Sequence, residues 1–238
     1  MVNVAAIALA VVATASAAVS STSAATNADA ASVHLNVHKG YNNYKPPAFV
    51  YKFDPDYAAG VKGKIKVKYA STDADETQAR VSAKLDFSGI DMDALKAFDG
   101  NCTEEVTEFQ WHIHVNWGNE YDSASFADCG KAITGNHYDP LKACGPNSEF
   151  VDTDECKPKT PLYDCTPETY AADPLVCEKG DLAGKFGNFY VDDYSYVHSA
   201  YIDEDYPTVG ENTPTWNIIL HAVCGKVTPR IACALGKQ

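Results

Sequence analysis

Histidines at three places in this chain have the spacing and surroundings of metal ligands. His112 and His114 flank Ile113 in a segment with the pattern of a strand. Residues i and i+2 of a strand share one face and lie about 7 Å apart, so both imidazoles can reach the same ion. The His-x-His pattern alone is equally compatible with two polar residues on a solvated strand face.

Two further histidines favour the metal interpretation. His221 ends the apolar run at residues 218–220, where an imidazole without a partner would be costly. His137 lies in a segment rich in turn residues, 135–140 (GNHYDP). Four imidazoles from two strands and a loop suit copper, which nitrogen ligands in a tetragonal arrangement favour.

Short runs rich in Val, Ile, Tyr and Phe indicate the strands that must position these histidines. Eight such runs occur, at residues 48–53, 61–69, 79–87, 106–115, 187–191, 195–202, 215–223 and 229–235. Only residues 92–98 have the pattern of a helix. Residues 116–180 form one long irregular stretch, which is unusual in a compact domain unless it is functional or crosslinked. The sequence predicts an all-β fold of eight antiparallel strands, a sandwich or barrel with one long loop stapled by disulfides.

Composition restricts the partners and the compartment. The 238-residue chain has 45% hydrophobic residues, which is enough for a full core. Its 19 Lys and Arg against 32 Asp and Glu give a net charge of −13, so we expect neither nucleic acid nor an anionic membrane as a partner. The even number of eight cysteines predicts disulfides and an oxidising compartment.

The N-terminal residues agree with export from the cell. Residues 1–18 form an apolar run that ends near Ala-Ser-Ala, typical of a signal peptide, although no Lys or Arg precedes the run. A buried N-terminal helix is the alternative. We expect a flexible leader at 19–46 and one domain at 47–238. No other stretch is long and apolar enough for a membrane span, so the sequence predicts a secreted, extracellular protein. We expect it to be a monomer.

Five motifs in chain order resemble those of the copper/zinc superoxide dismutase family. They are FQWHIH (109–114), GNHYDP (135–140), GDLAGKFG (180–187), NIILH (217–221) and PRIACALG (229–236), and the resemblance covers about residues 48–235. It implies an eight-stranded Greek-key β-barrel and a disulfide between Cys129 and Cys233. It implies that Arg230 guides an anionic substrate to a copper ion, and that the copper ligands are His112, His114, His137 and His221.

The chain departs from this family at the zinc site. His137 and Asp181 match two of the four zinc ligands, but Cys144 and Glu178 stand where the other two histidines are expected. We therefore expect no zinc. In the copper-only, secreted branch that this pattern resembles, a glutamate at the position of Glu178 interacts with the bridging histidine in place of zinc. Such a carboxylate fixes the tautomer and orientation of the imidazole, whereas a solvated acidic turn is the alternative for Glu178 and Asp181.

A second departure lies between two of the motifs. Only eight residues separate His221 from Arg230, so the long charged loop of typical members is absent. This too resembles the copper-only branch. Lys226 lies between the two and, together with Arg230, would give a local positive patch in an acidic chain.

The resemblance implies that the chain converts superoxide to dioxygen and hydrogen peroxide at a single copper. His137 would leave and rejoin the copper while it carries a proton, beside Glu178, and Arg230 would supply a fixed cation near the open coordination position. One competing hypothesis is an extracellular protein that stores copper without turnover, which retention of Arg230 disfavours. The other is a catalytically silent interaction module, which four intact ligands disfavour.

The cysteines other than Cys129 and Cys233 admit many pairings. Closure between nearest neighbours favours Cys165–Cys177 and Cys144–Cys156, and leaves Cys102–Cys224. A zinc knot is the less favoured alternative, because secreted thiols oxidise. The remaining histidines have plainer interpretations: we expect His34 and His38 on a surface strand and a structural role for His198.

Overall fold

Antiparallel strands make up most of the regular structure in this computed structural model, which describes residues 45–238. The strands are β1 (Ala48–Phe53), β2 (Lys62–Tyr69), β3 (Ala79–Asp86), β4 (Glu108–His114), β5 (Ser123–Ser125), β6 (Phe189–Tyr190), β7 (Tyr196–Asp203), β8 (Asn217–Ala222) and β9 (Arg230–Lys237). The predicted all-β antiparallel fold is confirmed, with nine strands instead of eight. The predicted signal peptide, almost all of the predicted leader, and both His34 and His38 lie outside the described residues.

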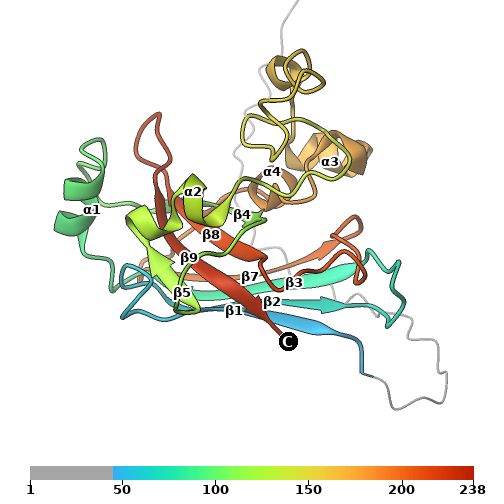
Figure 1. Cartoon of the computed structure of the whole chain (residues 1–238). Helices are drawn as coiled ribbons and strands as arrows, with labels where there is room; N and C mark the ends of the chain where they lie inside the picture. The colour runs from blue at the N-terminus through green and yellow to red at the C-terminus, as the bar shows by residue number, and fades with distance from the viewer. Residues whose placement is uncertain (1–44) are drawn as a thin grey trace, which may run out of the picture. The chain divides into compact units, whose positions relative to one another are not determined.

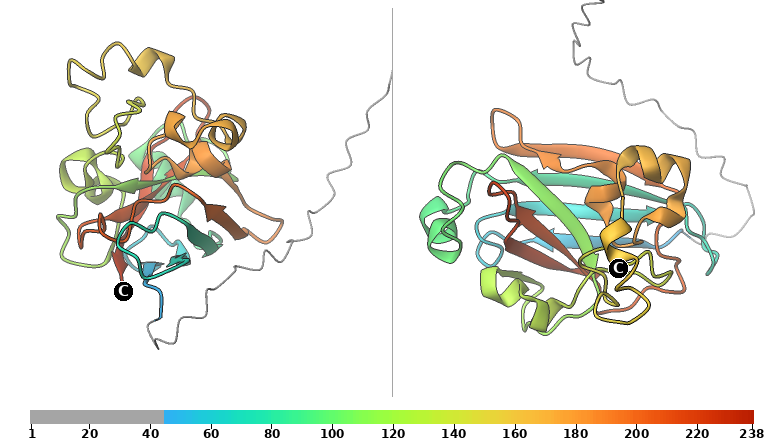
Figure 2. Two further views of the ribbon diagram at one scale, coloured as in Figure 1. Left: turned by 90° about the vertical axis from the view of Figure 1, so that its right-hand side faces the viewer. Right: turned by 90° about the horizontal axis from the view of Figure 1, so that it is seen from above.

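The strands form two layers of a nearly closed barrel (Figure 1, Figure 2). The first layer, sheet A, consists of β1, β2, β3 and β7, and the second, sheet B, of β6, β4, β8 and β9, with β5 added beside β9. Pairing of Val50 with Lys237 and of Tyr51 with Gly236 joins the two layers at β1 and β9. The chain crosses from sheet A to sheet B after β3 and again after β7, as a Greek key requires.

Alternation of side chains along the strands explains where the core lies. In β2, Ile65, Val67 and Tyr69 are buried while the lysines between them are exposed. In β4, Phe109, Trp111 and Ile113 point into the barrel, and the indole of Trp111 stacks on Phe189 at a centroid distance of 4.4 Å. The alternate residues Gln110, His112 and His114 therefore face out of the barrel on sheet B.

The helices show that the sequence-based expectation was incomplete. α1 (Met92–Phe98) forms where a helix is predicted, but α2 (Lys131–Thr134), α3 (Pro167–Ala172) and α4 (Leu182–Phe186) also occur, as do three 3₁₀ turns at Phe126–Cys129, Thr160–Leu162 and Pro174–Val176. The prediction of a single helix was wrong. The added helices have four to six residues, too short for an apolar period, and start at caps such as Thr166 and Asp181.

The strand β5 was also not predicted. Its sequence, Ser123-Ala124-Ser125, lacks the bulky residues of a typical strand, and the segment is extended because it pairs with Ala232–Ala234 of β9. Tertiary pairing therefore decided its conformation. None of the helices within residues 45–238 is long and apolar enough to cross a membrane.

Four disulfides crosslink the fold, and they are the pairs that the sequence favours. Cys144–Cys156 and Cys165–Cys177 each close 12 residues within the long segment 116–180, which we call the excursion. Cys102–Cys224 and Cys129–Cys233 join distant segments, with sequence separations of 122 and 104. All eight cysteines are paired, so the zinc knot considered as an alternative does not form.

Candidate metal centre

Four histidines meet on the outer side of sheet B, beneath the excursion. One ring nitrogen of each lies within 4.8 Å of the others, and all four side chains are buried. They are His112, His114, His137 and His221, the set that the sequence predicts. The ring centroids of His112 and His137 are only 4.1 Å apart. This set is called the histidine cluster.

Strand register brings three of these residues together. His112 and His114 are two residues apart on β4. His221 of β8 pairs with Gln110 of β4, which lies on the same face as His112 and His114, so all three histidines project from that face. A register shift follows Leu220 and aligns His221 with Arg230 of β9. His137 comes from the loop after α2 and forms an isolated bridge with His114. The loop is held in place because the carbonyl of Asn136 accepts from Val115 N–H.

Each imidazole is held by one of its nitrogens. His114 Nδ1 lies 3.1 Å from the carbonyl oxygen of Gly135, and His221 Nδ1 lies 2.9 Å from that of Thr228. Since a carbonyl only accepts, both Nδ1 atoms must carry the proton. Two carboxylates hold the other rings: His137 Nδ1 is 2.6 Å from Glu178 Oε2, and His112 Nε2 is 3.4 Å from Asp181 Oδ1.

The opposite nitrogen of each ring is buried and has no hydrogen-bond partner. These atoms are His112 Nδ1, His114 Nε2, His137 Nε2 and His221 Nε2. A buried polar atom without a partner is costly, and four of them gathered in one place require an explanation. The tautomers fixed by the outer hydrogen bonds leave a lone pair on each inner nitrogen. Four imidazole nitrogens without a thiolate or carboxylate among them fit a first-row transition metal such as copper.

The two carboxylates beside the cluster are buried, with Glu178 0% and Asp181 8% exposed. A solvated acidic turn, the alternative considered for them, is therefore wrong. Burial raises the pKa of Glu178 well above its ordinary value, and the neighbouring Asp181 adds to this. Burial alone would also raise the pKa of Asp181, but His112, His137 and the backbone N–H of Gly184 together outweigh it and hold this pKa low. A Cβ at Gly145 would come within 2.4 Å of Glu178 Oε1, so only glycine allows the loop this close.

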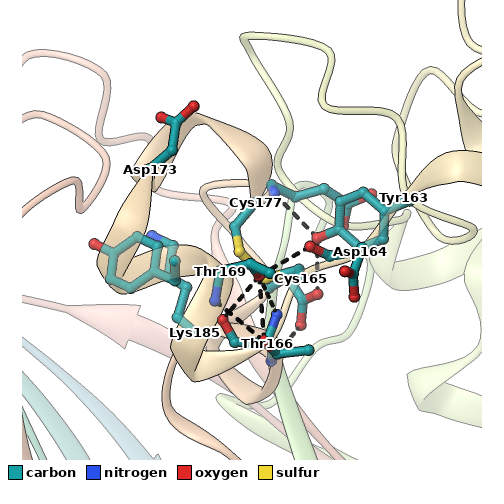
Figure 3. Close-up of a disulfide and its surroundings, with 12 residues drawn as sticks. Tyr163, Asp164, Cys165, Thr166, Thr169, Asp173, Cys177 and Lys185 are labelled. Carbon is teal, nitrogen blue, oxygen red and sulfur yellow. Dashed lines mark hydrogen bonds between the residues drawn. A yellow bond between two sulfur atoms is a disulfide. The ribbon is translucent and has the colours of Figure 1, made fainter.

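Tyr163 is a site residue that sequence reasoning missed. Its hydroxyl donates to Asp181 Oδ2 at 2.8 Å and accepts from the backbone N–H of Glu178 at 3.1 Å. One phenol thus holds both acidic residues that orient the imidazoles. Tyr163 precedes Cys165 by two residues and lies beside the Cys165–Cys177 bridge (Figure 3). Its place next to a cysteine in the excursion was the one signal that the sequence offered.

The histidines are neutral at pH 7. Burial is the main cause, lowering the pKa of both His112 and His137 to about 4 and those of His114 and His221 well below the ordinary value. The positive charge of Arg230 contributes to the lowered pKa of His114, His137 and His221. Neutral imidazole is the form that binds a metal.

Arg230 stands beside the cluster, on β9 opposite His221. Its guanidinium is half-buried and donates to the carbonyl oxygens of Cys129 and Gly135, to Thr134 Oγ1 and to Asn136 Oδ1. Burial lowers the pKa of Arg230 to about 10, so it remains charged at neutral pH. Lys226 lies in the exposed turn between β8 and β9.

The positions where the resembled family has its other zinc ligands hold no imidazole. Cys144 is bonded to Cys156, and Glu178 contacts the cluster through His137. His198, the one histidine of residues 45–238 outside the cluster, is exposed on β7 and pairs with Lys84 of β3.

Comparison with known proteins gives matches among solved structures. No family model and no curated protein matches the chain. The copper(II) form of Candida albicans superoxide dismutase 5 has 20% sequence identity and a TM-score of 0.49, with 80% of this chain and 91% of that chain covered. Two single-residue mutants of the same protein have 22% identity and TM-scores of 0.46 and 0.47, covering 81% and 82% of this chain and 90% and 92% of theirs.

Proposed function

We propose that this chain is a secreted, copper-dependent superoxide dismutase of the copper-only type. The observation that carries the proposal is the set of four buried, unpartnered imidazole nitrogens that converge within 4.8 Å. Two further observations support it: the five family motifs in chain order, and the position of Arg230, a residue of the fifth motif, as a fixed cation beside the cluster. Four disulfides suit the extracellular location expected from the N-terminal sequence.

His112, His114, His137 and His221 would hold the copper through their inner nitrogens. Copper, when bound, supplies the one-electron oxidation and reduction by which two superoxide anions and two protons become dioxygen and hydrogen peroxide. The protein prepares those nitrogens in advance, because outer hydrogen bonds to Gly135, Glu178 and Thr228 and the contact of His112 with Asp181 fix each tautomer. Little reorganisation is then needed when the metal enters.

Arg230 and His137 have separate tasks in this proposal. Arg230 attracts the anionic substrate and is preorganised, since four acceptors fix its guanidinium. His137 is assigned to proton transfer. Its Nε2 atom takes up and releases the proton, while its Nδ1 atom stays protonated and donates to the Glu178 carboxylate. The buried Glu178 carboxylate thereby keeps the ring in place through a cycle of protonation.

Metal analysis and an assay of superoxide consumption on the same samples test the proposal. We expect about one copper and less than one zinc per chain in the wild type. His221→Ala removes one of the four nitrogens and should abolish copper binding and activity together. His198→Ala, the matched control on an exposed strand position, should retain both.

Three results would speak against the proposal. Equal loss in His198→Ala and His221→Ala would show that the ligands are wrong. A full equivalent of zinc retained after dialysis would exclude the copper-only type. A protein that binds copper at these four residues but does not consume superoxide would be a storage protein.

A further inference from the structure

The outer face of sheet A carries a row of exposed basic side chains that the proposed function does not use. Lysines alternate with core residues along β2, and further basic residues follow on β1 and β3. The set is called the basic face and consists of Lys52, Lys62, Lys64, Lys66, Lys68, Arg80 and Lys84. In a chain of net charge −13, this concentration on three neighbouring strands is unexpected.

Strand register places like charges directly opposite one another. Lys64 pairs with Lys52 on one side and with Lys84 on the other, and Lys68 pairs with Arg80. Neighbouring strands lie about 4.8 Å apart and alternate residues about 7 Å apart, within the screening length of about 8 Å at physiological salt. Like charges opposite one another destabilise a sheet. The sheet therefore tolerates electrostatic repulsion between these side chains.

The described residues offer little compensation for this cost. Of the basic face, only Lys52 has a carboxylate oxygen within 4.0 Å, that of Asp54, in residues 45–238. Asp54 and Asp86 lie at the ends of the face, next to β1 and on β3. The centre, around Lys64 and Lys66, has no ion-pair partner among the residues that the structure describes.

The neighbouring residues of the face indicate the kind of partner. The other outward positions on β1, β2 and β3 are Ala48, Val50, Ser82 and Asp86, so the lysines are not interleaved with aromatic rings. Proteins that bind single-stranded nucleic acid need such rings for base stacking. Large apolar side chains that could enter a lipid surface are also missing from these three strands. Rows of point charges suit a linear polymer with regularly spaced anions.

We propose that the basic face binds a linear anionic polysaccharide through its carboxylate or sulfate groups. The hydrophobic core of the barrel lies between this face and the histidine cluster, which projects from the outer side of sheet B. Figure 1 shows the strands of the two sheets as separate layers. A polymer on sheet A would therefore leave the metal centre open to solution. The local field of the basic face overcomes the repulsion expected from the net charge, because screening limits that repulsion to short range.

The test is titration calorimetry of the full chain with three probes: heparin, polygalacturonate and uncharged dextran. The wild type should bind both anionic polymers at about 50 mM salt and release them at about 1 M, where the screening length is about 3 Å, and dextran should not bind. The triple variant Lys64→Gln, Lys66→Gln, Lys84→Gln should bind at least about tenfold more weakly. Its copper content should equal that of the wild type, because no changed residue lies near the cluster.

A matched triple variant controls for net charge. This control carries the changes Lys131→Gln, Lys157→Gln and Lys159→Gln, which remove the same charge from exposed positions within the excursion. Its affinity for the polysaccharides should stay within about twofold of the wild type. Equal weakening in both triple variants, or no binding of either polysaccharide, would overturn the proposal. Duplex DNA or phosphatidylserine vesicles bound more tightly than the polysaccharides, through the same lysines, would overturn it in favour of those partners.

Discussion

At the scale of single residues, the cluster is defined by which nitrogen of each imidazole is left free. His112 and His114 are two residues apart on one strand, yet His112 presents Nδ1 and His114 presents Nε2. The difference follows from their outer partners, Asp181 for His112 and the carbonyl of Gly135 for His114. The tautomers are thus set by the surroundings of the strand and not by the His-x-His pattern.

Acid should destabilise the metal-free protein through these buried imidazoles. The pKa values of His112 and His137 are about 4 in the folded chain against an ordinary value of 6.5. Below pH 6.5 the unfolded state therefore binds more protons, so stability is complete above about 6.5 and falls as the pH falls towards 4. Urea denaturation of metal-free protein between about pH 7 and 4.5 should show a decreasing free energy of unfolding.

Glu178 should act in the opposite direction over this range. Its pKa is raised in the folded state, so protonation favours folding as the pH falls. Glu178→Gln removes this contribution and should make the acid-induced loss of stability steeper, whereas His198→Gln should leave the profile unchanged. If the metal-free Glu178→Gln variant is equally stable from pH 7 to 4.5, the assignment of neutral, buried imidazoles is wrong.

Tyr163 should tune the metal centre without binding the metal. Tyr163→Phe removes the hydroxyl that holds Asp181 and Glu178, so the His112 and His137 rings lose part of their support. Changes of this kind weaken metal binding by roughly tenfold. We expect a roughly tenfold weaker copper affinity and an altered electron paramagnetic resonance spectrum of the Cu(II) form.

Tyr170→Phe is the matched control. The Tyr170 hydroxyl donates to Asp203 Oδ1 at 2.6 Å in the same part of the chain, but Asp203 pairs with Lys185 and does not contact the cluster. This variant should lower stability and leave the copper spectrum unchanged. Identical electron paramagnetic resonance spectra for wild type and Tyr163→Phe would contradict the positioning role of Tyr163.

The residues of the cluster were partly predictable from the sequence. Strand periodicity alone places His112 and His114 on one face. The apolar run before His221 and the turn residues around His137 point to these two, and the motif resemblance implies all four. Tyr163 was not predictable, because its contacts with residues 15 and 18 positions away depend on the path of an irregular segment. No periodicity encodes such a path.

At the scale of elements, the excursion is the part that builds the outer wall of the site. It supplies His137, Tyr163 and Glu178, and the cap of α4, Asp181, follows directly after it. The Cys165–Cys177 bridge joins the segment after Tyr163 to the segment before Glu178 (Figure 3). Disulfides therefore stabilise the conformation of the excursion, whereas the hydrophobic core stabilises the barrel.

Removing two different disulfides should separate stability from metal affinity. The bridge Cys165–Cys177 closes 12 residues, and its loss should cost about 2–3 kcal/mol of stability. Cys102–Cys224 spans 122 residues, and its loss should cost about 4–5 kcal/mol. Copper affinity should nevertheless fall more in the double Cys→Ala variant at 165 and 177, because that bridge holds Tyr163 and Glu178.

Denaturation curves and copper titrations of the two double variants check this expectation. The variant at 102 and 224 serves as the comparison, since that bridge joins the segment after α1 to the β8–β9 turn and lies outside the excursion. If copper affinity follows global stability in both variants, the excursion has no special role in the metal centre.

The elements were predictable in proportion to their length and apolar pattern. The long strands and α1 were predicted within about two residues, because their side chains alternate or repeat over several turns. β5, α3 and α4 were missed because a three-residue strand and five- or six-residue helices have no such period. Pairing with β9 and caps at Thr166 and Asp181 determine them instead.

At the scale of the whole molecule, the net charge is a poor description of the local electrostatic field. The chain carries −13, yet Arg230 stands beside the cluster and seven basic residues gather on sheet A. Composition gives the sum but not the arrangement, since alternation along β2 alone places four lysines on one face. A small anion at the cluster experiences the nearby Arg230 more strongly than distant carboxylates, which salt screens.

The most direct measurement of the central claim is the rate of superoxide decay per bound copper. Copper-loaded wild type should consume superoxide far faster than the metal-free chain. Arg230→Glu should bind the same copper but react much more slowly at low salt, with a smaller difference at about 1 M salt, where the screening length is about 3 Å. A wild-type chain that holds one copper at the four histidines and consumes superoxide no faster than the metal-free chain would contradict the account.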